Sequence, residues 1–427
     1  MNFAIISTAL DCLGMAHRLK NEGHKVFINY KEKSETGSGF GFEFDYGSVE
    51  SFVSKHKKDI ILFEDSSKGI LQGKLRKLGF KVIGSSAWGE KIEKDRMFGI
   101  EFAKSLGINV PQSFDVKSTK EAIKFIKDNP KQYILKQEGD MVKSLSNKSD
   151  FDDSRDLIDD LEQLEKTDPK LASKMVLQEV IDGTEVACGA WFNKDWIKQG
   201  GTLLELNFEN KPLLQDNRGI STGEMGTGFY FTNKVNRIFT EMLEPLTETL
   251  KKEDYIGCID SNCMYSNNKL YLLEWTARFG YPISDGYIEL LNTDLGEFFN
   301  NMIEGKEVDF NLKDKGMVLS VPFPLFPYEK ASGKVESFKH KAIWLDELND
   351  EEINKVHFAG LMKDDKIRIA NDYGFALTVT GSGKTFEDAN KEAWDIVEKI
   401  KPSKKSYARS DLGKCVEERY NKVKSIL

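Results

Sequence analysis

The sequence predicts a chain of several domains that combines α/β and α+β architecture, and three observations support this fold class. Strand-like and helix-like segments alternate over residues 3–83, which is typical of a parallel sheet covered by helices. Strand-like segments follow one another over much of residues 175–276, which is typical of an antiparallel sheet. The 427 residues also exceed the about 250 to 300 that a single hydrophobic core accommodates. We therefore expect three domains.

The first domain is predicted over residues 1–105 as a parallel α/β unit. Strands are expected at Phe3–Ser7, Lys25–Tyr30, Asp59–Phe63 and Lys81–Ile83, with helices at Leu13–Asn21 and Gly69–Leu78. Residues 7–14 join the first strand to the first helix and lack the G-x-G-x-x-G pattern of dinucleotide-binding proteins. The pattern therefore gives no support for a dinucleotide at this turn.

The second domain is predicted over residues 106–315. It begins with a helix at Thr119–Asp128 and a strand at Tyr133–Lys136, and periodic leucines in the acidic segment 143–174 predict a solvated amphipathic helix. Later elements are strands at Met175–Val180, Glu185–Trp191 and Gly201–Phe208, a helix at Lys234–Lys252, a hairpin at 257–280 and a helix at Leu295–Glu304.

The third domain is predicted over residues 316–427 as a small α+β unit. Pro322, Pro324 and Pro327 fall within six residues, which indicates an edge strand and a turn at its start. Two strands within Lys366–Gly381 and a helix at Thr385–Lys399 follow. Gly381–Thr385 imitates a phosphate loop, but Thr378 stands where that motif needs glycine, so a turn before a helix is predicted there.

Composition limits the classes of function. The formal net charge of −8 and the isoelectric point near 5.5 argue against nucleic acid or anionic lipid as a partner. The five cysteines include no C-x-x-C pair, which is typical of reduced thiols in a cytoplasmic protein. No segment approaches 18 apolar residues, so we expect no membrane span. The five histidines lack the spacing of a zinc site or a hydrolase triad.

The hairpin carries the strongest chemical signal. Asp260 lies in an apolar strand, the polar turn 266–268 reverses the chain, and Glu274 lies in the returning strand, so the two carboxylates are expected to be cross-strand neighbours. A carboxylate in an apolar strand is costly unless a cation compensates it, which favours Mg²⁺ over a merely solvated pair of acids. Arg278 adds a fixed cation suited to phosphate oxygens.

Three further features are compatible with a bound nucleotide, although each has an ordinary structural explanation. Lys136 ends an apolar strand and is either an edge residue or a phosphate ligand. Residues 177–185 form a strand, a connector and a tight turn, either a plain hairpin or a place where the backbone reads adenine and Glu185 binds ribose. Residues 216–228 are rich in glycine, which indicates either a flexible loop or backbone amides that approach an anion.

The order of these features resembles that of the ATP-grasp superfamily. Along nearly its whole length, the chain resembles glycinamide ribonucleotide synthetases, the phosphoribosylamine–glycine ligases. The similar motifs are Glu179–Val186, Thr222-Gly-Glu-Met-Gly226 and Leu273–Gly280, followed by Phe358-Ala-Gly360, Val379-Thr380 and Arg409–Gly413. The resemblance implies an N-terminal α/β domain, an ATP-grasp core of two α+β subdomains and a small C-terminal α+β domain. It also implies ATP and Mg²⁺ or Mn²⁺ as cofactors.

The resemblance assigns roles residue by residue. Arg278 and Lys136 would act in catalysis, and Asp260, Glu274 and Thr276 would bind the metal. The nucleotide would contact Arg96, Lys136, Gln178, Glu179, Ile181, Glu185, Lys211, Gly223 and Gly226. The implied reaction activates a carboxylate, glycine or another amino acid, as an acyl phosphate, and a small amine then displaces the phosphate to give an amide.

Several motifs of that family are altered. Thr8-Ala-Leu-Asp-Cys12 replaces a glycine-rich G-G-R-E turn, Phe63–Lys68 replaces G-P-E-x-P-L, and Tyr281-Pro-Ile283 replaces D-P-E. Arg96 stands where the family generally has lysine, and Thr276 where it has asparagine.

These departures leave three functions open. They are glycinamide ribonucleotide synthesis in purine biosynthesis, ligation of an amino acid to a different amine, and nucleotide binding without catalysis.

Overall fold

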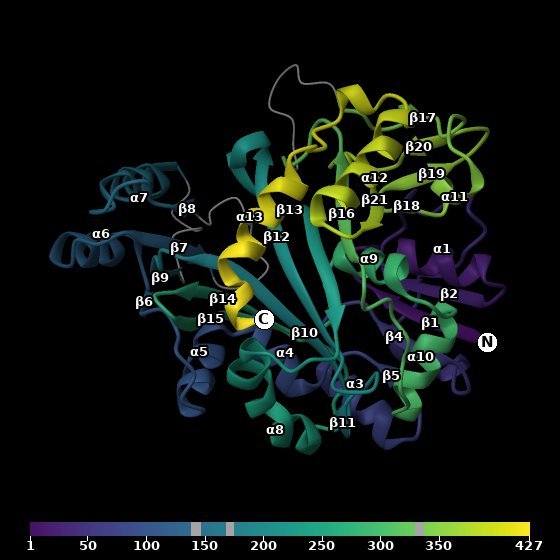
Figure 1. Ribbon diagram of the computed structural model, residues 1–427, viewed down its shortest axis with the longest axis horizontal. Helices are drawn as coiled ribbons and strands as arrows, with labels where there is room; N and C mark the ends of the chain where they lie inside the picture. Colours follow the sequence, from purple (N-terminus) through teal and green to yellow (C-terminus); the bar gives the residue numbers. More distant parts are fainter. Residues whose placement is uncertain (138–146, 168–174, 329–336) are drawn as a thin grey trace.

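The computed structural model describes residues 1–137, 147–167, 175–328 and 337–427. Four sheets organise these residues: one parallel, the others antiparallel. The C-terminal strands extend the largest sheet, the N-terminal unit lies beside them, and a smaller unit projects from the sheet (Figure 1). The α/β and α+β fold class predicted from the sequence is confirmed.

The N-terminal sheet is parallel throughout, in the order β3-β2-β1-β4-β5. Its strands are β1 (Asn2–Ser7), β2 (Lys25–Tyr30), β3 (Glu43–Asp45), β4 (Ile60–Phe63) and β5 (Lys81–Ile83), and its helices are α1 (Leu13–Asn21), α2 (Val49–Lys55) and α3 (Gly69–Lys77). Nearly every side chain of β1 and β4 is buried, because helices cover both faces of such a sheet. The carboxyl ends of β1 and β4 lie side by side and open toward the site described below.

A small antiparallel sheet forms the projecting unit, with strand order β6-β9-β7-β8. It consists of β6 (Ser113–Val116), β7 (Tyr133–Gln137), β8 (Asn147–Lys148) and β9 (Met175–Glu179), with α6 (Thr119–Asp128) and α7 (Arg155–Thr167). These elements share a hydrophobic core of their own. The amphipathic helix predicted within residues 143–174 is α7, and both ends of that segment lie partly outside the described residues.

The central sheet runs through the middle of the molecule in the order β15-β14-β10-β12-β13-β16-β21-β18, with β11 on β10. Its strands are β10 (Thr184–Asn193), β11 (Asp195–Trp196), β12 (Leu204–Leu214), β13 (Arg218–Thr232), β14 (Ile256–Ser266), β15 (Lys269–Thr276), β16 (Lys315–Pro322), β18 (Val356–Phe358) and β21 (Phe375–Gly383). Alternate side chains enter different cores. Cys188, Ala190 and Phe192 pack with the C-terminal helices, and Trp191 packs with the N-terminal unit.

The structure differs from the sequence predictions at two places in this region, and the flexible loop considered for residues 216–228 is excluded. The glycine-rich segment 216–228 is mostly strand β13, because β12 on one side and β16 on the other supply hydrogen-bonding partners to its backbone. The helix predicted at Lys234–Lys252 is interrupted: η3 (Phe239–Leu243) and η4 (Glu244–Leu246) precede α8 (Thr247–Lys252). Pro245 lies at this break and has no backbone N–H to donate within a helix.

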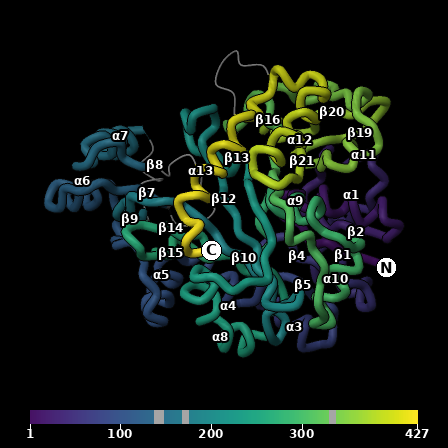
Figure 2. Tube along the Cα trace, viewed as in Figure 1, coloured from purple at the N-terminus to yellow at the C-terminus, as the bar shows by residue number. Residues whose placement is uncertain are grey.

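The C-terminal segment adds strands to the central sheet. The proposed domain boundary at residues 315/316 coincides with the start of β16, which pairs with β13 and with β21. The remaining C-terminal elements are β17 (Ala342–Ile343), α11 (Asp350–Ile353), β19 (Leu361–Lys363), β20 (Ile367–Ile369), α12 (Phe386–Lys399), η5 (Ser403–Lys405), α13 (Leu412–Val423) and η6 (Lys424–Ile426). Helix α13 brings the C-terminus back onto β12 and β13, as the chain trace shows (Figure 2).

Four helices connect the units. They are α4 (Ala87–Lys94) and α5 (Arg96–Ser105), which pack on β15, and α9 (Ile283–Leu290) and α10 (Leu295–Glu304), which lie against the N-terminal unit. Among the described residues, no helix is long and apolar enough to cross a membrane.

Candidate active site

The hairpin β14–β15 forms as predicted, but its register differs from the expected one. Asn267 and Asn268 both have positive φ, 49° and 59°, which closes the two-residue turn that matches strand twist. Asp260 lies opposite Thr276, and Glu274 lies opposite Asn262. Asp260 and Glu274 are therefore diagonal neighbours on one face, not a direct pair. An irregularity after Asn262 shifts the pairing by one residue and places Glu274 on this face.

Glu274 stands among cations from four separate elements. Arg96 at the start of α5 approaches it at 3.4 Å, and Lys136 from β7, Lys211 from β12 and Arg278 after β15 act on it electrostatically. Burial raises the pKa of Glu274, but these four cations outweigh burial and hold the pKa at about 2. The side chain is nevertheless 44% exposed, so the carboxylate is ionised and open to the cleft.

Lys136 is a cation within the same cluster of charged side chains. Burial, together with the positive charges of Arg96 and Lys211, lowers its pKa to about 8, although Glu274 and Glu185 raise it. The ammonium group is thus easily deprotonated in the absence of an anion. Arg96 also keeps one buried guanidinium nitrogen, Nη1, without a hydrogen-bond acceptor. Both cations would gain from a polyanionic ligand in the cleft.

Lys211 and Glu185 form the far side of the same cluster. The Lys211 ammonium donates to Glu185 at 3.0 Å and lies 2.9 Å from Glu209. Asn262 donates to the same oxygen of Glu185 at 2.8 Å, while its own Oδ1 is buried without a donor. Burial raises the pKa of Glu185, and the charge of Lys211 with the Asn262 hydrogen bond lowers it to a net value below the usual range.

The connector that was predicted to read adenine joins the small sheet to the central sheet. The buried side chain of Gln178 donates a hydrogen bond to the Ser113 hydroxyl at 3.0 Å, and the carboxylate of Glu179 accepts one from Lys131 at 3.1 Å. Residues 180–183, which include Ile181, lie between β9 and β10 and have no regular secondary structure.

The two glycines assigned to the nucleotide lie on β13. A side chain at Gly226 would meet the carbonyl oxygen of Val318 at 2.5 Å, so this position serves close packing of β13 on β16. Gly223 has open space beside it and lines a cavity of about 460 Å³ that Arg278 also lines. These glycines contribute to strand packing and to that cavity's wall.

Asp260 has a different environment from Glu274. It accepts a hydrogen bond from Asn207 at 3.0 Å and lies near the buried carboxyl of Glu205. Burial and the neighbouring Glu205 raise the pKa of Asp260 well above its usual range, and burial raises that of Glu205 to about 7. Burial therefore disfavours the charged form of both acids.

The hairpin offers oxygen donors of three kinds to a metal ion. They are the open carboxylate of Glu274, the hydroxyl of Thr276 and the unpartnered Oδ1 of Asn262, all on one face. Oxygen ligands of this kind suit Mg²⁺. Among the described residues, a separate group of possible metal ligands consists of Glu22, His24 and Asp294. One potential ligand atom from each of these side chains lies within 4.8 Å of the other two.

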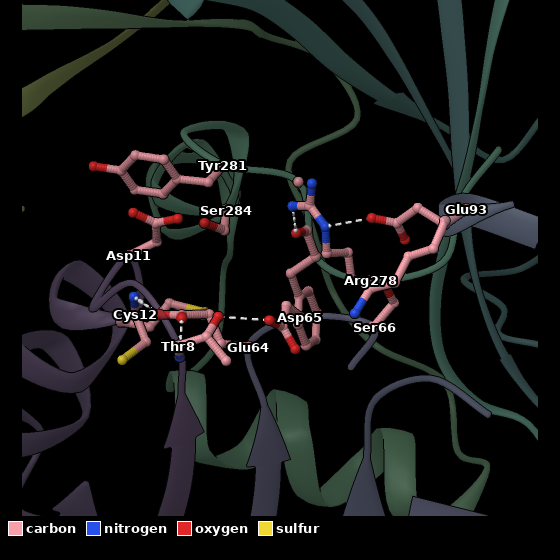
Figure 3. A pocket seen from close by; sticks show the side chains of 14 residues that line it. Thr8, Asp11, Cys12, Glu64, Asp65, Ser66, Glu93, Arg278, Tyr281 and Ser284 are labelled. Atoms are coloured by element: carbon pink, nitrogen blue, oxygen red, sulfur yellow. Dashed lines mark hydrogen bonds and ion pairs between the residues drawn. The ribbon is translucent and has the colours of Figure 1, made fainter. Parts of the chain in front are cut away.

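Arg278 lies where the central sheet meets the N-terminal unit. Its Nε donates to Glu93 of α4 at 2.9 Å, and the other Glu93 oxygen accepts from the backbone N–H of Ala277 at 3.0 Å (Figure 3). Glu93 thereby links the guanidinium group of Arg278 to the backbone N–H of the preceding residue, Ala277. No pattern in the sequence indicates the role of Glu93, since the partners are 185 residues apart along the chain.

Beyond Arg278 the chain forms a second cavity of about 190 Å³ with an acidic wall. Asp11, Glu64 and Asp65 line it from the carboxyl ends of β1 and β4, and Glu93 lines it from α4 (Figure 3). Both cavities share Asp11, Arg278 and Tyr281. Arg278 therefore separates a cationic cleft around Glu274 from an acidic space on the N-terminal side.

Comparisons with known proteins agree with this architecture. Residues 94–284 match the family model described as phosphoribosylglycinamide synthetase, ATP-grasp (A) domain. A phosphoribosylamine–glycine ligase from Clostridium acetobutylicum is 22% identical over 376 residues, which cover 85% of this chain and 86% of that protein. The enzyme of the same name from Caldanaerobacter subterraneus subsp. tengcongensis is 24% identical over 368 residues, covering 82% and 84%.

Solved structures show the same fold. The crystal structure of phosphoribosylamine–glycine ligase from Thermotoga maritima superposes with a TM-score of 0.72 at 18% identity, covering 96% of this chain and all of that one. N5-carboxyaminoimidazole synthetase from Staphylococcus aureus, complexed with ADP, gives a TM-score of 0.58 at 16% identity and covers 93% and 96%.

Fold and comparisons together define the class of this protein: it is an ATP-grasp ligase, an enzyme that forms carbon–nitrogen bonds. Within that class it is similar to phosphoribosylamine–glycine ligases at about a fifth of positions, as the 22% identity shows.

Proposed function

We propose that this protein uses ATP to join a carboxylate to an amine, through an acyl phosphate. The observation that carries the proposal is the set of cations around Glu274, because Arg96, Lys136, Lys211 and Arg278 converge from distant parts of the chain on one open carboxylate. Phosphoryl transfer depends mostly on positioning and charge neutralisation, and such an arrangement supplies both.

The residues of the cleft would divide the work by position. Arg96 has an unpartnered buried Nη1, and Lys136 is buried beside the positive charges of Arg96 and Lys211. Both would bind the phosphates of the nucleotide. Glu185 and Lys211 would bind ribose and phosphate, and the backbone from Gln178 to Ile181 would bind adenine. Gly223 and Gly226 would contribute through the backbone, because strand β13 can approach the nucleotide at positions without a side chain.

Arg278 would stabilise the phosphoryl group during transfer and the acyl phosphate after it. Glu93 holds its guanidinium group in place, and burial is outweighed by the neighbouring acids, which raise the pKa of Arg278. Arg278 is therefore a permanent cation at the border between the nucleotide cleft and the second cavity, where the amine would attack.

Glu274 and Thr276 would hold magnesium, together with Asp260 beneath them and with Asn262. Bound there, the ion would neutralise negative charge on the phosphates. Asn262 enters the set on structural grounds, since it lies directly opposite Glu274 and its Oδ1 has no donor. Asp260 is the weakest member, because burial and the neighbouring Glu205 disfavour its charged form and raise its pKa.

The substrates follow from the relatives. Glycine and phosphoribosylamine are the pair that the names of the similar enzymes indicate, and with this pair the protein would act in purine biosynthesis. A different amine is the second candidate, supported by the acidic wall of Asp11, Glu64 and Asp65 next to Arg278. The domain limits 1–105, 106–315 and 316–427 belong to the same proposal.

Amine-dependent release of ADP tests the proposed function. Purified protein would be given ATP, Mg²⁺ and glycine, with and without freshly made phosphoribosylamine, and then with a panel of amino acids and amines. The ligase proposal predicts ADP release that requires both a carboxylate and an amine and is lost in Glu274→Ala. Nucleotide binding without ADP release from any pair would instead support a protein without catalytic activity.

A further inference from the structure

The part of β12 that carries Lys211 has irregular strand pairing. The pairing of β12 with β10 ends at Asn207, and its pairing with β13 shifts register between Asn210 and Pro212 and again between Pro212 and Leu214. Backbone carbonyl groups in such a segment need donors from elsewhere, because an unpaired carbonyl away from water is costly. The side chains that supply these donors therefore help to determine where the backbone of Lys211 lies.

Arg419 of α13 holds the three residues just before Lys211. Its Nη1 donates to the carbonyl of Glu209 at 2.8 Å, and its Nη2 donates to the carbonyl of Phe208 at 3.3 Å and to Oδ1 of Asn210 at 2.9 Å. Acceptors on three consecutive residues thus share one planar guanidinium group, whose rigid geometry fixes their relative positions.

Arg409 holds the residues that follow Lys211. It is 1% exposed, its Nη1 donates to the carbonyl of Pro212 at 2.8 Å, and its Nη2 donates to Oδ1 of Asn217 at 3.1 Å. Asp411 orients the guanidinium group by accepting from Nε at 3.0 Å and from Nη2 at 2.7 Å. The two arginines of the C-terminal segment therefore contact β12 on both sides of Lys211.

Apolar packing attaches α13 to the central sheet independently of these hydrogen bonds. The helix lies beside β12 and β13 (Figure 1). Three of its buried side chains belong to the same hydrophobic core as β12, namely Leu412, Val416 and Val423. The hydrogen bonds of Arg409 and Arg419 have a different distribution, because they converge on the residues that flank Lys211.

The ammonium group of Lys211 depends on this backbone for its position. It lies 3.0 Å from Glu185 and 2.9 Å from Glu209, and the Lys211 carbonyl accepts from the Thr222 hydroxyl at 2.7 Å. Glu209 is both a side-chain partner of Lys211 and a residue whose carbonyl Arg419 holds. A shift of the backbone at Glu209 would therefore move the ammonium group and its acidic partner together.

We propose that Arg419 and Arg409 are positioning residues of the nucleotide site, which place Lys211 against the ribose and phosphates of ATP through the backbone of β12. The inference rests on the proposed role of Lys211 in nucleotide binding, and it makes helix α13 part of that site. Both arginines lie outside residues 94–284, the segment that matches the ATP-grasp domain model. The motif at residues 409–413 thereby has a physical role beside the nucleotide.

Calorimetric titration of the full chain with ATP and Mg²⁺ tests the positioning role without requiring turnover. Arg419→Lys keeps the charge but replaces a planar group that reaches three acceptors with one ammonium group, so we expect ATP affinity to fall about fivefold. Arg409→Lys should have a similar effect from the other side of Lys211. Lys422→Gln, an exposed lysine on the same helix, is the matched control and should bind ATP as the wild type does.

A double-mutant cycle distinguishes positioning of Lys211 from general support of the fold. Lys211→Met alone should weaken ATP binding about tenfold, and adding Arg419→Lys should weaken it little further, because residues that act through one contact are not additive. Independent effects would instead multiply to about fiftyfold. Val423→Ala, which loosens the apolar packing of α13, should lower the melting temperature while ATP affinity stays within about twofold of the wild type.

Wild-type ATP affinity in Arg419→Lys, or a multiplicative loss in the double variant, would overturn the positioning role. The same follows if Val423→Ala weakens ATP binding as much as Arg419→Lys does, since helix stability would then account for both. If one arginine variant fails to fold, the other tests the same segment from the opposite side of Lys211. Absence of ADP release from every substrate pair would contradict the ligase proposal alone, whereas failure of the wild type to bind ATP would contradict both.

Discussion

The two sides of Arg278 carry opposite charge. On the nucleotide side, Arg96, Lys136 and Lys211 act on the ionised carboxylate of Glu274. On the N-terminal side, acids including Asp11 and Asp65 face Arg278 itself. The first side is complementary to a polyanion and the second to a cation, so the site distinguishes its substrates by charge before any specific contact forms.

The contrast also shows in the pKa values of the two sides. Crowding of like charge and burial lower the pKa of Lys136 to about 8, and burial raises the pKa of Asp285, behind the acidic cavity, to about 7. Each side therefore contains a group that titrates near neutral pH and that a ligand of opposite charge would return to its ionised form.

The largest effect is expected from a substitution of Glu274, at the centre of the cationic side. Glu274→Gln removes the charge that the four cations surround, and we expect the rate of ADP formation to fall by about 10² to 10³-fold. Steady-state measurement at saturating ATP and Mg²⁺ checks this. Glu248→Gln, an 85% exposed glutamate on α8, is the matched control and should retain full activity. Activity within a factor of two of wild type in Glu274→Gln would contradict the central role of Glu274.

A smaller effect is expected at the border between the two sides. Arg278→Lys keeps the charge but loses the planar group that donates to Glu93, so we expect kcat to fall by about 10²-fold while the KM for ATP changes little. Glu93→Gln keeps an acceptor for Arg278 and should cost about tenfold, as loss of an orienting partner usually does. A larger loss in Glu93→Gln than in Arg278→Lys would reverse the assigned roles.

A third prediction concerns the pH dependence of ATP affinity, which should follow the protonation of Lys136 on the cationic side. Its protonated form binds phosphate, and its pKa in the free protein is about 8, so ATP affinity should fall as pH rises from 7 to 9. Lys136→Ala should weaken ATP binding about tenfold at pH 7 and show a flatter pH profile, whereas Lys136→Arg should stay charged throughout. Calorimetry at three pH values checks both. Unchanged ATP affinity in Lys136→Ala would exclude Lys136 from the phosphate site.

The sequence predicted the elements of this site better than its contacts. Periodicity located α1, α6 and α10 and the paired strands of the hairpin, since local patterns determine these features. It could not locate the irregularity after Asn262, which decides that Asn262, and not Asp260, lies opposite Glu274. It also could not show that the glycine-rich segment is a strand, because partners far along the chain determine that outcome.

The acidic side was the least predictable part. The sequence showed that Thr8–Cys12 and Phe63–Lys68 depart from the resembled family, but it did not show that they meet. In the structure Glu64 closes the Thr8–Cys12 turn across 52 to 56 residues of chain through hydrogen bonds to backbone N–H groups. Such bonds depend on the fold and not on side-chain identity at the turn, so no motif encodes them.

The smallest expected effect concerns stability on the acidic side. Asp285 is 1% exposed, accepts from the Thr378 hydroxyl at 2.7 Å, and keeps Oδ1 without a partner against α1. Burial raises its pKa to about 7, although the Thr378 hydrogen bond opposes this. Because the folded pKa lies above the unfolded one, the folded state binds more protons between about pH 4 and 7, and stability falls as pH rises through that window.

Asp285→Asn removes this titration while keeping an acceptor for Thr378. We expect the melting temperature of the wild type to fall by a few degrees more between pH 5.5 and 8 than that of the variant, measured by calorimetry in one buffer series. Asp346→Asn, an exposed aspartate, should follow the wild type. An identical pH slope in Asp285→Asn would mean that Asp285 does not hold a proton in the folded state. The charge contrast across Arg278 would then rest on the cavity walls alone, since the buried layer behind them would carry no titrating acid at this position.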